Sequence, residues 1–201
     1  MSETRKEEVM NIIISGLTCS GKTTLSNEIY NQNNNTCILR EDDYMKDNTF
    51  IPHKGKFYLM DLPRAYNIEE YLNDIDRLLR EGLCYYPLYD FNINKRINKN
   101  ELKERKEINI FEGLHTIELL KDLRDSIKVF MDTDIDTCLE RRIIRDTNVY
   151  KVQERQVREY FNEVILPIYK THIECQRDLS DVVIRKEDDK KCFLKKLQTY
   201  Y

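Results

Sequence analysis

Residues 16–23 read Gly-Leu-Thr-Cys-Ser-Gly-Lys-Thr, which matches the pattern G-x-x-x-x-G-K-[ST] of a loop that binds nucleotide phosphates. Its two glycines allow backbone angles that turn N–H groups toward a phosphate. A helix that begins near Lys22 directs its unpaired N–H groups and the positive end of its dipole at the same anion. The lysine reaches the β- and γ-phosphates, and the Thr23 hydroxyl can ligate Mg²⁺. The predicted nucleotide-binding residues are Gly16, Ser20, Gly21, Lys22, Thr23 and Thr24.

The sequence on either side of this loop supports the same interpretation. The apolar run from Met10 to Ser15 predicts a buried parallel strand before the loop, and residues 23–30 predict a helix after it. The alternative is a chance match. At an ordinary glycine content of ~7%, the fixed positions would coincide in less than about one in a hundred chains of this length. This chain has only 5 glycines, which makes coincidence rarer still.

A phosphate loop alone does not distinguish a GTPase, a motor ATPase and a kinase. The guanine-recognition pattern N-K-x-D is absent, because neither Asn-Lys pair, at 94–95 and at 98–99, has an aspartate two residues after its lysine. The sequence also has no D-x-x-G switch, and 201 residues are few for a motor. A small-molecule kinase and a closely related transferase are the classes that remain.

Strand and helix patterns alternate along the rest of the chain. Further strands are expected at 36–39, 108–111, 127–131 and 182–184. Further helices are expected from a cap at Asn67 to about Arg80, with Gly82 after its end, over 134–145, over 153–177 with a kink or break at Pro167, and at the basic C-terminus. Residues 43–66 look irregular, and the charged segment 92–107 looks like a solvated excursion.

Alternating strands and helices imply right-handed crossovers and a parallel sheet covered on both faces. We therefore predict an α/β fold, a P-loop kinase three-layer sandwich with a mainly parallel central sheet. A length of 201 residues fits one domain, residues 1–201.

The composition limits the partners and the compartment. With 33 basic and 36 acidic side chains the formal net charge is −3, so nucleic-acid binding is not expected. No apolar run reaches the ~20 residues of a membrane span, and residues 1–8 are too polar for a targeting peptide. The six cysteines are scattered, which favours reduced thiols in the cytoplasm and gives no zinc-site pattern. The oligomeric state is left open.

Several segments, in order, resemble uridine kinases and the related nicotinamide riboside kinases. The segment 41–47, Glu-Asp-Asp-Tyr-Met-Lys-Asp, is similar to their aspartate-containing segment, and 87–91, Pro-Leu-Tyr-Asp-Phe, is similar to their Pro-x-Tyr-Asp-Phe. Phe-Glu-Gly-Leu at 111–114 matches their Glu-Gly strand end. The stretch 128–146 resembles their Val-Asp-Thr-Asp strand and arginine-rich lid, which implies a helical lid at approximately 141–155. The resemblance covers nearly the whole chain and implies an ATP-dependent (or GTP-dependent) phosphotransferase that uses Mg²⁺ and an alcohol group as acceptor.

The resemblance also implies the catalytic residues. Asp42 would be the general base for the attacking hydroxyl, with the adjacent Asp43 as the alternative. Glu112 would hold Mg²⁺ together with Thr23. This acid follows a buried strand, at the sheet edge where ligands collect.

The basic residues of the lid have candidate roles as well. Lys22, Arg142 and Arg145 would carry the positive charge that phosphoryl transfer needs, and Arg145 would also contact the substrate. Arg141 is a nucleotide contact or a solvated arginine. Asp61 would bind a ribose hydroxyl, and Tyr89 would stack on the base or belong to the core.

The base-reading positions depart from the uridine kinase pattern. Asn94 stands where those enzymes carry a histidine, and the Arg-Gly-Arg stretch that follows their lid is missing after Asp146. A glutamine of the next helix is replaced by Glu159. An aromatic such as Tyr150 or Tyr89 could instead stack on a cationic pyridine, as in nicotinamide riboside kinases.

We predict phosphorylation of a ribonucleoside 5′-hydroxyl, with uridine or cytidine as the default acceptor and nicotinamide riboside or another small metabolite as the alternative. A regulatory module that binds ATP without transferring phosphate is the rival from another class. Such a module would need only the phosphate loop. The joint presence of Asp42, Glu112 and the lid arginines therefore favours an enzyme.

Overall fold

The centre of the molecule is a five-stranded sheet with the strand order β2-β7-β1-β8-β9. Our computed structural model describes residues 9–91 and 93–200, so the N-terminal segment 1–8, for which we predicted no targeting signal, lies outside the described residues. All four strand pairs of the sheet are parallel, as the alternating pattern predicted. Its strands are β1 (Met10–Gly16), β2 (Thr36–Arg40), β7 (Ile108–Glu112), β8 (Ser126–Met131) and β9 (Val182–Ile184).

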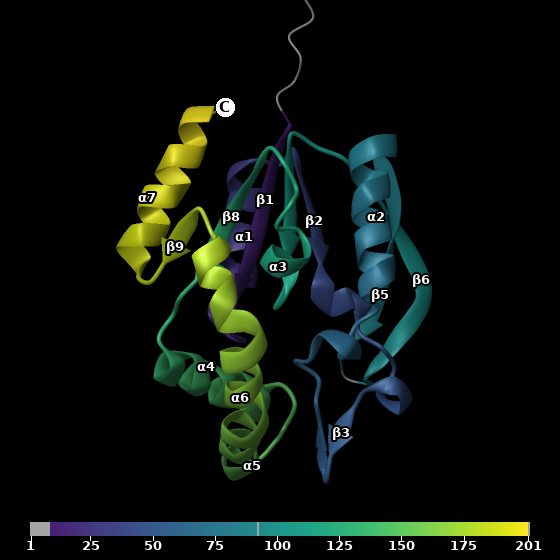
Figure 1. Cartoon of the computed structure of the whole chain (residues 1–201), viewed down its shortest axis with the longest axis vertical. Coiled ribbons are helices and arrows are strands. Elements are labelled where there is room, and N and C mark those ends of the chain that lie inside the picture. The colour runs from purple at the N-terminus through teal and green to yellow at the C-terminus, as the bar shows by residue number, and fades with distance from the viewer. Residues whose placement is uncertain (1–8, 92, 201) are drawn as a thin grey trace, which may run out of the picture.

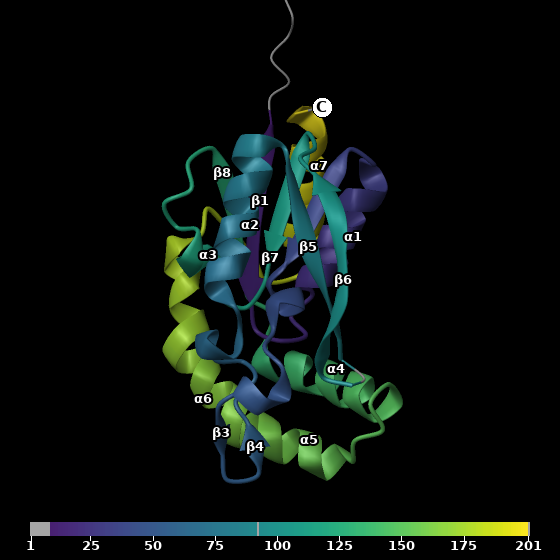
Figure 2. The same cartoon turned by 90° about the vertical axis from the view of Figure 1, so that its right-hand side faces the viewer.

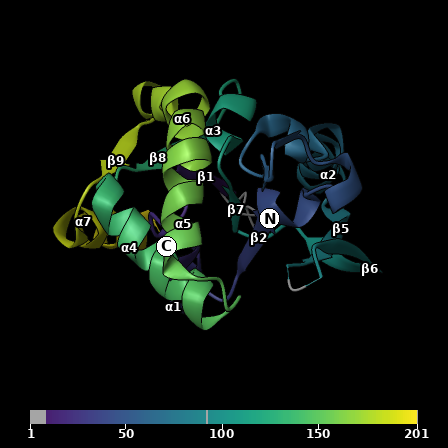
Figure 3. The ribbon, with the colours of Figure 1, turned by 90° about the horizontal axis from the view of Figure 1, so that it is seen from below.

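Helices cover both faces of this sheet and make a three-layer sandwich (Figures 1 and 3). On one face the buried cluster joins Ile12 and Ile14 of β1 to the first and last helices. On the other face Ile13 of β1 packs with α2, α3 and the helices that follow α5. The helices are α1 (Lys22–Gln32), α2 (Ile68–Glu81), α3 (Thr116–Leu119), α4 (Ile135–Asn148), α5 (Glu154–Tyr160), α6 (Leu166–Ile168) and α7 (Glu187–Leu197).

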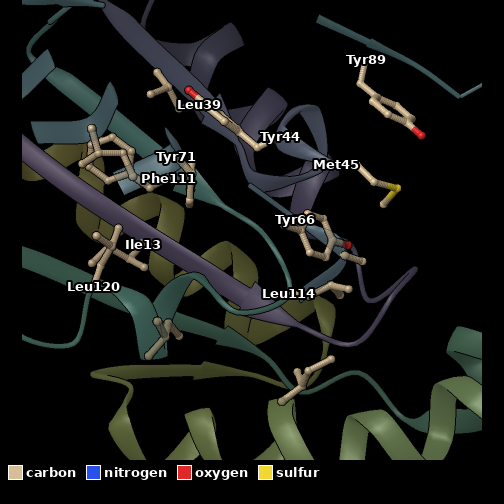
Figure 4. Packing of buried hydrophobic residues seen from close by; sticks show 14 of the residues in the cluster. Ile13, Leu39, Tyr44, Met45, Tyr66, Tyr71, Tyr89, Phe111, Leu114 and Leu120 are labelled. Carbon is tan, nitrogen blue, oxygen red and sulfur yellow. The ribbon is translucent and has the colours of Figure 1, made fainter. Parts of the chain in front are cut away.

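Local sequence explains where the long helices begin and end. The Asp134 carboxylate accepts hydrogen bonds from the N–H groups of Asp136 and Thr137, and so caps α4. Gly82 ends α2 with φ +84°, a left-handed conformation that glycine adopts without a steric penalty. Figure 4 shows Leu39, Tyr71 and Phe111 packed beside β1, and Met45, Tyr66 and Leu114 nearer the carboxyl end of that strand.

A long antiparallel ribbon was missed by our prediction of a solvated excursion over 92–107. Its strands β5 (Leu83–Asp90) and β6 (Lys95–Glu104) pair with each other beside α2 (Figure 2). Two features of the sequence make this ribbon difficult to predict. Pro87 interrupts the first strand next to a register shift, and the second strand is rich in lysine, asparagine and glutamate, which are depleted in strands. The ribbon is stabilised because Cys84, Tyr86 and Tyr89 are buried.

We predicted a kink or break at Pro167 in the helix over 153–177. The structure shows no break there, because helical turns continue on both sides of the proline. π-Helical turns at Phe161–Ile165 and Tyr169–Ile173 flank the proline, and a 3₁₀ segment at Glu174–Leu179 completes the run. The wider π turn closes its hydrogen bonds five residues apart, so the helix continues past a residue without an N–H. The run therefore spans 154–179 as one helical body.

The predicted irregular segment 43–66 contains only short turns and the small hairpin β3 (His53–Lys54) and β4 (Phe57–Tyr58). This hairpin lies at the end of the molecule that also holds α4 and α5, below the sheet in Figure 1. All six cysteines are free, and three of them are buried: Cys37, Cys84 and Cys138. Within the part of the chain that the structure describes, no helix is long and apolar enough to cross a membrane.

Candidate active site

A cavity of about 930 Å³ opens at the carboxyl ends of the sheet strands, below α1 and above the lid helices. This edge is where open parallel sheets bind their ligands. A second cavity of about 890 Å³, beside α2, contains none of the predicted site residues within the described chain. The predicted site residues that line the first cavity are Gly21, Lys22, Thr23, Thr24, Asp42, Asp61, Glu112, Arg141, Arg142 and Arg145.

Hydrogen bonds from Lys22 fix the conformation of the phosphate loop. Lys22 Nζ donates hydrogen bonds to the carbonyls of Gly16 and Leu17, both at 3.1 Å. The Thr133 hydroxyl donates to the Ser20 carbonyl at 2.8 Å and ties the loop to the end of β8. Gly16, with φ +150°, is irreplaceable, because a Cβ there would lie 2.6 Å from the Met131 carbonyl oxygen. Gly16 and Ser20 shape the loop from below and do not line the cavity.

Glu112 lies beside Thr23, as the expected metal site requires. The Thr23 hydroxyl is 3.2 Å from Glu112 Oε1, and the Ser26 hydroxyl donates to Oε2 at 2.8 Å. Glu112 is buried, with 3% of its surface exposed, while Thr23 is open to the cavity. One hydroxyl and one carboxylate are hard oxygen donors that suit Mg²⁺, an ion that takes its other ligands from phosphates and water. The donor set therefore fits this metal.

Asp42 and Asp43 have different environments although they are adjacent. The Asp42 side chain is exposed in the cavity. Asp43 is partly buried and accepts a hydrogen bond from the Tyr86 hydroxyl. Burial raises the pKa of the Asp43 carboxyl, although the hydrogen bond from Tyr86 opposes the shift. Of the two, Asp42 is the carboxylate that faces the cavity.

The preceding residue, Glu41, is a buried acid that fixes the position of Asp42. Its Oε2 accepts hydrogen bonds from the His115 N–H at 2.8 Å and the Thr116 hydroxyl at 3.3 Å, while Oε1 has no partner among the described residues. Burial raises the pKa of Glu41 to about 8, so this carboxyl is mainly protonated at pH 7. Only a glycine fits at Gly113, since a Cβ there would lie 2.1 Å from Glu41 Oε2.

Asp61 lines the cavity and carries an oxygen without a hydrogen-bond partner among the described residues. Only 6% of the residue is exposed, and its Oδ2 has no partner among the described residues. Burial raises the pKa of this carboxyl, and the charge of Arg142 opposes the shift. His115 Nε2 lies 2.9 Å from the Asp61 carbonyl oxygen and must carry the proton, because a carbonyl only accepts.

Tyr89 is packed in the core, and its neighbour Phe91 lines the cavity in its place. The Tyr89 ring is 7% exposed, and its centroid lies 4.8 Å from that of Phe91. Figure 4 places Tyr89 on the ribbon, apart from Tyr66 and Leu114. Asn94 also lines the cavity.

The lid arginines contact the phosphate loop directly. Arg142 Nη1 donates to the Thr18 hydroxyl at 3.0 Å, and Arg141 Nη1 donates to the Cys19 carbonyl at 3.4 Å. Asp146 holds two of the arginines in place, since its carboxylate accepts from Arg142 Nε at 3.1 Å and from Arg145 Nε at 2.8 Å. The arrangement directs three positive charges at the space above the loop.

A clasp, formed by Tyr160 and Glu159 of α5, joins that helix to the small β3–β4 hairpin. The Tyr160 hydroxyl donates to the Tyr58 carbonyl at 2.7 Å, and Lys56 pairs with Glu159 at 2.7 Å. The Arg142 guanidinium lies over the Tyr160 ring, 5.5 Å from its centroid. The clasp therefore connects Arg142, which contacts the phosphate loop, to the hairpin that precedes Asp61.

Our reading of the sequence missed several residues of this site. Arg40, Asp146, Phe91 and Tyr66 all line the cavity, and Glu41 and His115 support it from the core. One signal was available for Arg40, because it closes a strand just before the candidate base. The buried network of Glu41 and His115 had no signal, because nothing in sequence brings residues 41, 61 and 115 together.

The strand order, the phosphate loop and the basic lid define a P-loop kinase. A family model described as the phosphoribulokinase / uridine kinase family matches residues 11–192. The chain belongs to that family, in agreement with the resemblance read from its motifs.

Curated relatives named uridine kinase support this assignment. One from Clostridium perfringens is 33% identical over 177 residues, which are 85% of this chain and 84% of the relative. Another from Bacillus pumilus is 32% identical over 176 residues, 85% of this chain and 83% of the relative.

Solved structures share the fold at low identity. D-glycerate 3-kinase from Cryptococcus neoformans superposes with a TM-score of 0.56 at 13% identity, over 84% of this chain and 80% of that one. A Silicibacter sp. TM1040 protein, a candidate fructose transport system kinase, has a TM-score of 0.72 at 17% identity, over 91% and 93% of the two chains. These likenesses support the fold and leave the acceptor open.

Proposed function

We propose that this chain transfers the γ-phosphoryl group of ATP to the 5′-hydroxyl of a ribonucleoside, with uridine or cytidine as the first acceptors to test. The observation that carries the proposal is the convergence of Asp42, Lys22 and the lid arginines on one cavity. A module that only binds ATP would not need an exposed carboxylate opposite the phosphate loop. The names of the uridine kinase relatives support the choice of acceptor.

In this mechanism Asp42 accepts the proton of the attacking hydroxyl. The hydroxyl oxygen forms a bond to the γ-phosphorus while the bond from that phosphorus to the bridging oxygen of ADP breaks in line. Lys22 exchanges its hydrogen bonds with the Gly16 and Leu17 carbonyls for contacts with the phosphates, and Arg142 and Arg145 stabilise the charge that develops on the transferred group. A Mg²⁺ ion at Thr23 and Glu112 would neutralise charge on the β- and γ-phosphates.

The acceptor side follows from the same cavity. The unpaired Oδ2 of Asp61 can accept hydrogen bonds from a ribose hydroxyl, and the ring of Phe91 offers a face for the base. The segment 141–155, which carries the arginines, acts as the lid in this proposal.

A cationic pyridine nucleoside such as nicotinamide riboside is the second candidate. Tyr150 lines the cavity together with the carboxylates of Asp42 and Asp61, and its ring already has one cation beside it, the Arg145 guanidinium at 5.8 Å from the ring centroid, so a cationic substrate would have to replace that contact. Glu159 contributes less than its sequence position indicated, because its charge is paired with Lys56.

The test is ADP release by the pure protein with Mg-ATP, and in parallel Mg-GTP, against uridine, cytidine, adenosine, nicotinamide riboside and pantothenate. We expect uridine or cytidine to stimulate release well above the rate without acceptor. Stimulation by nicotinamide riboside alone would replace the pyrimidine assignment. Tight ATP binding without stimulation by any acceptor would favour the regulatory module.

A further inference from the structure

Arg40 forms an ion pair with Glu112, the carboxylate that the proposed mechanism assigns to the metal. It ends β2 and lies opposite Glu112 in the parallel register with β7. Paired residues of neighbouring strands point to the same face, so both side chains extend toward α1. Arg40 Nε is 2.9 Å from Glu112 Oε1, and Arg40 Nη2 donates to Asn27 Oδ1 of α1 at 3.2 Å. The guanidinium is therefore held at the metal acid from two sides.

The hydrogen-bonding capacity of the Glu112 carboxylate is nearly used up by protein partners. Oε1 faces both the Thr23 hydroxyl and Arg40 Nε, and Oε2 accepts from Ser26. Each carboxylate oxygen has two lone-pair positions, so Oε1 has none left for another partner. Oε1 is also the oxygen nearer the Thr23 hydroxyl, which is the side where the metal belongs in the proposed function. A metal ion that uses Oε1, directly or through water, must displace a bond that is present now.

We propose that Arg40 competes with the Mg²⁺ ion for Glu112, so that metal–nucleotide binding releases a cation that the protein itself supplies. The inference rests on the proposed function. Its physical basis is charge. Glu112 is 3% exposed, and a buried carboxylate without a cationic partner is strongly unfavourable. The guanidinium of Arg40 is the cationic partner of this carboxylate. An arginine cannot lose its proton at working pH, so the two cations repel when both are present.

The released guanidinium has a second acceptor within reach. Asp43 lies close enough for its charge to act on Arg40, and the Tyr86 hydroxyl bridges them, accepting from the Arg40 backbone N–H at 3.4 Å and donating to Asp43. A guanidinium that leaves Glu112 therefore remains under the influence of the Asp43 charge. The competition lowers the affinity for the metal.

The experiment measures how free Mg²⁺ promotes binding of the β,γ-imido analogue of ATP, followed by calorimetry, so no acceptor is needed. The midpoint is the free Mg²⁺ concentration at which binding of the analogue is half-maximal. We expect Arg40→Met to lower this midpoint at least about fivefold, the lower end of typical coupling between two sites. Arg40→Lys keeps the charge and should stay within about twofold of wild type. Arg124→Met is the matched control, because Arg124 is an exposed arginine before the amino end of β8, at the opposite edge of the sheet.

Glu112→Gln supplies a second, independent readout. If the effect of Arg40 passes through Glu112, adding Arg40→Met to Glu112→Gln should leave the midpoint of Glu112→Gln unchanged. A further shift in the double variant would contradict the proposal. If Arg40→Met does not fold, as judged by circular dichroism, Arg40→Gln replaces it: a lower midpoint supports the competition, and an equal midpoint refutes it.

The outcomes separate this inference from the proposed function. An unchanged or raised midpoint in Arg40→Met, with normal Mg²⁺-dependent nucleotide binding in the wild type, overturns the competition and leaves the kinase proposal standing. No Mg²⁺-dependent nucleotide binding by the wild type overturns both.

Discussion

The carboxylate of Asp43 is engaged by Tyr86, whereas that of Asp42 is exposed in the cavity. Asp42→Asn should therefore lower kcat by about 10²–10⁴, the usual contribution of a general base. The dissociation constant of an ATP analogue should stay the same, because the phosphate loop is untouched. Asp43→Asn is the matched control and should retain most activity, since the amide oxygen can still accept from Tyr86. Loss of activity in the control with normal turnover in Asp42→Asn would make Asp43 the base.

Glu41 makes the free energy of unfolding depend on pH. Its pKa is raised to about 8 in the folded protein, so between about pH 4.3, the value in unfolded chains, and pH 8 the folded state binds the extra proton. Stability therefore falls as pH rises through this window and is constant above it. Glu41→Gln should remove the penalty and stabilise the protein at pH 8 by at most about 5 kcal/mol, because each unit of pKa shift corresponds to about 1.4 kcal/mol, with little effect at pH 4. Urea unfolding at both pH values measures this, and an equal effect at both would contradict the assignment.

Single residues show how far sequence alone can reach into this site. The phosphate loop is contiguous, so its pattern predicted a cradle that the structure contains. Glu41 looked like one more acid beside Asp42, and only its burial against His115 makes it a neutral, buried group. Tyr89 lies near the end of β5 and Phe91 directly follows that strand, and the path of the ribbon decided which of them reaches the cavity.

At the scale of elements, the clasp between α5 and the β3–β4 hairpin should control acceptor binding. Tyr160→Phe keeps the ring under Arg142 and removes the hydrogen bond to the Tyr58 carbonyl. A lost hydrogen bond of about 0.5–1.5 kcal/mol corresponds to a roughly 2–10-fold higher KM for the acceptor. We expect the KM for ATP to change little. Steady-state kinetics with both substrates checks this, and an equal rise in both KM values would indicate general damage to the fold.

Elements with one clear hydrophobic period were predictable, and those that depend on tertiary contacts were not. The strands of the central sheet are short apolar runs, so their positions and parallel direction followed from the pattern, whereas their order in the sheet did not. The β5–β6 ribbon is stabilised by burial against α2 and by cross-strand pairing, neither of which its charged sequence reveals. The helix through Pro167 depends on π turns that no local propensity indicates.

For the whole molecule, nucleotide binding should raise the melting temperature. A ligand at 100 times its Kd stabilises the native state by about 2.7 kcal/mol. For a chain of 201 residues that is a rise in Tm of about 5–10 °C. Mg-ADP in a thermal-unfolding scan should produce this shift, and Lys22→Met should lose most of it. A full shift in Lys22→Met would place the nucleotide elsewhere.

The helical run from 154 to 179 has one further consequence. Its amino end carries the clasp residues Glu159 and Tyr160, and near its carboxyl end Gln176 donates to the Leu114 carbonyl at 2.8 Å. Arg177, the next residue, pairs with Asp132 after β8 at 3.3 Å. At about 1.5 Å per residue, such a run acts as a lever with its pivot against the sheet. We expect any closure over an acceptor to tilt this helical run about Gln176 and to bend it at its π turns.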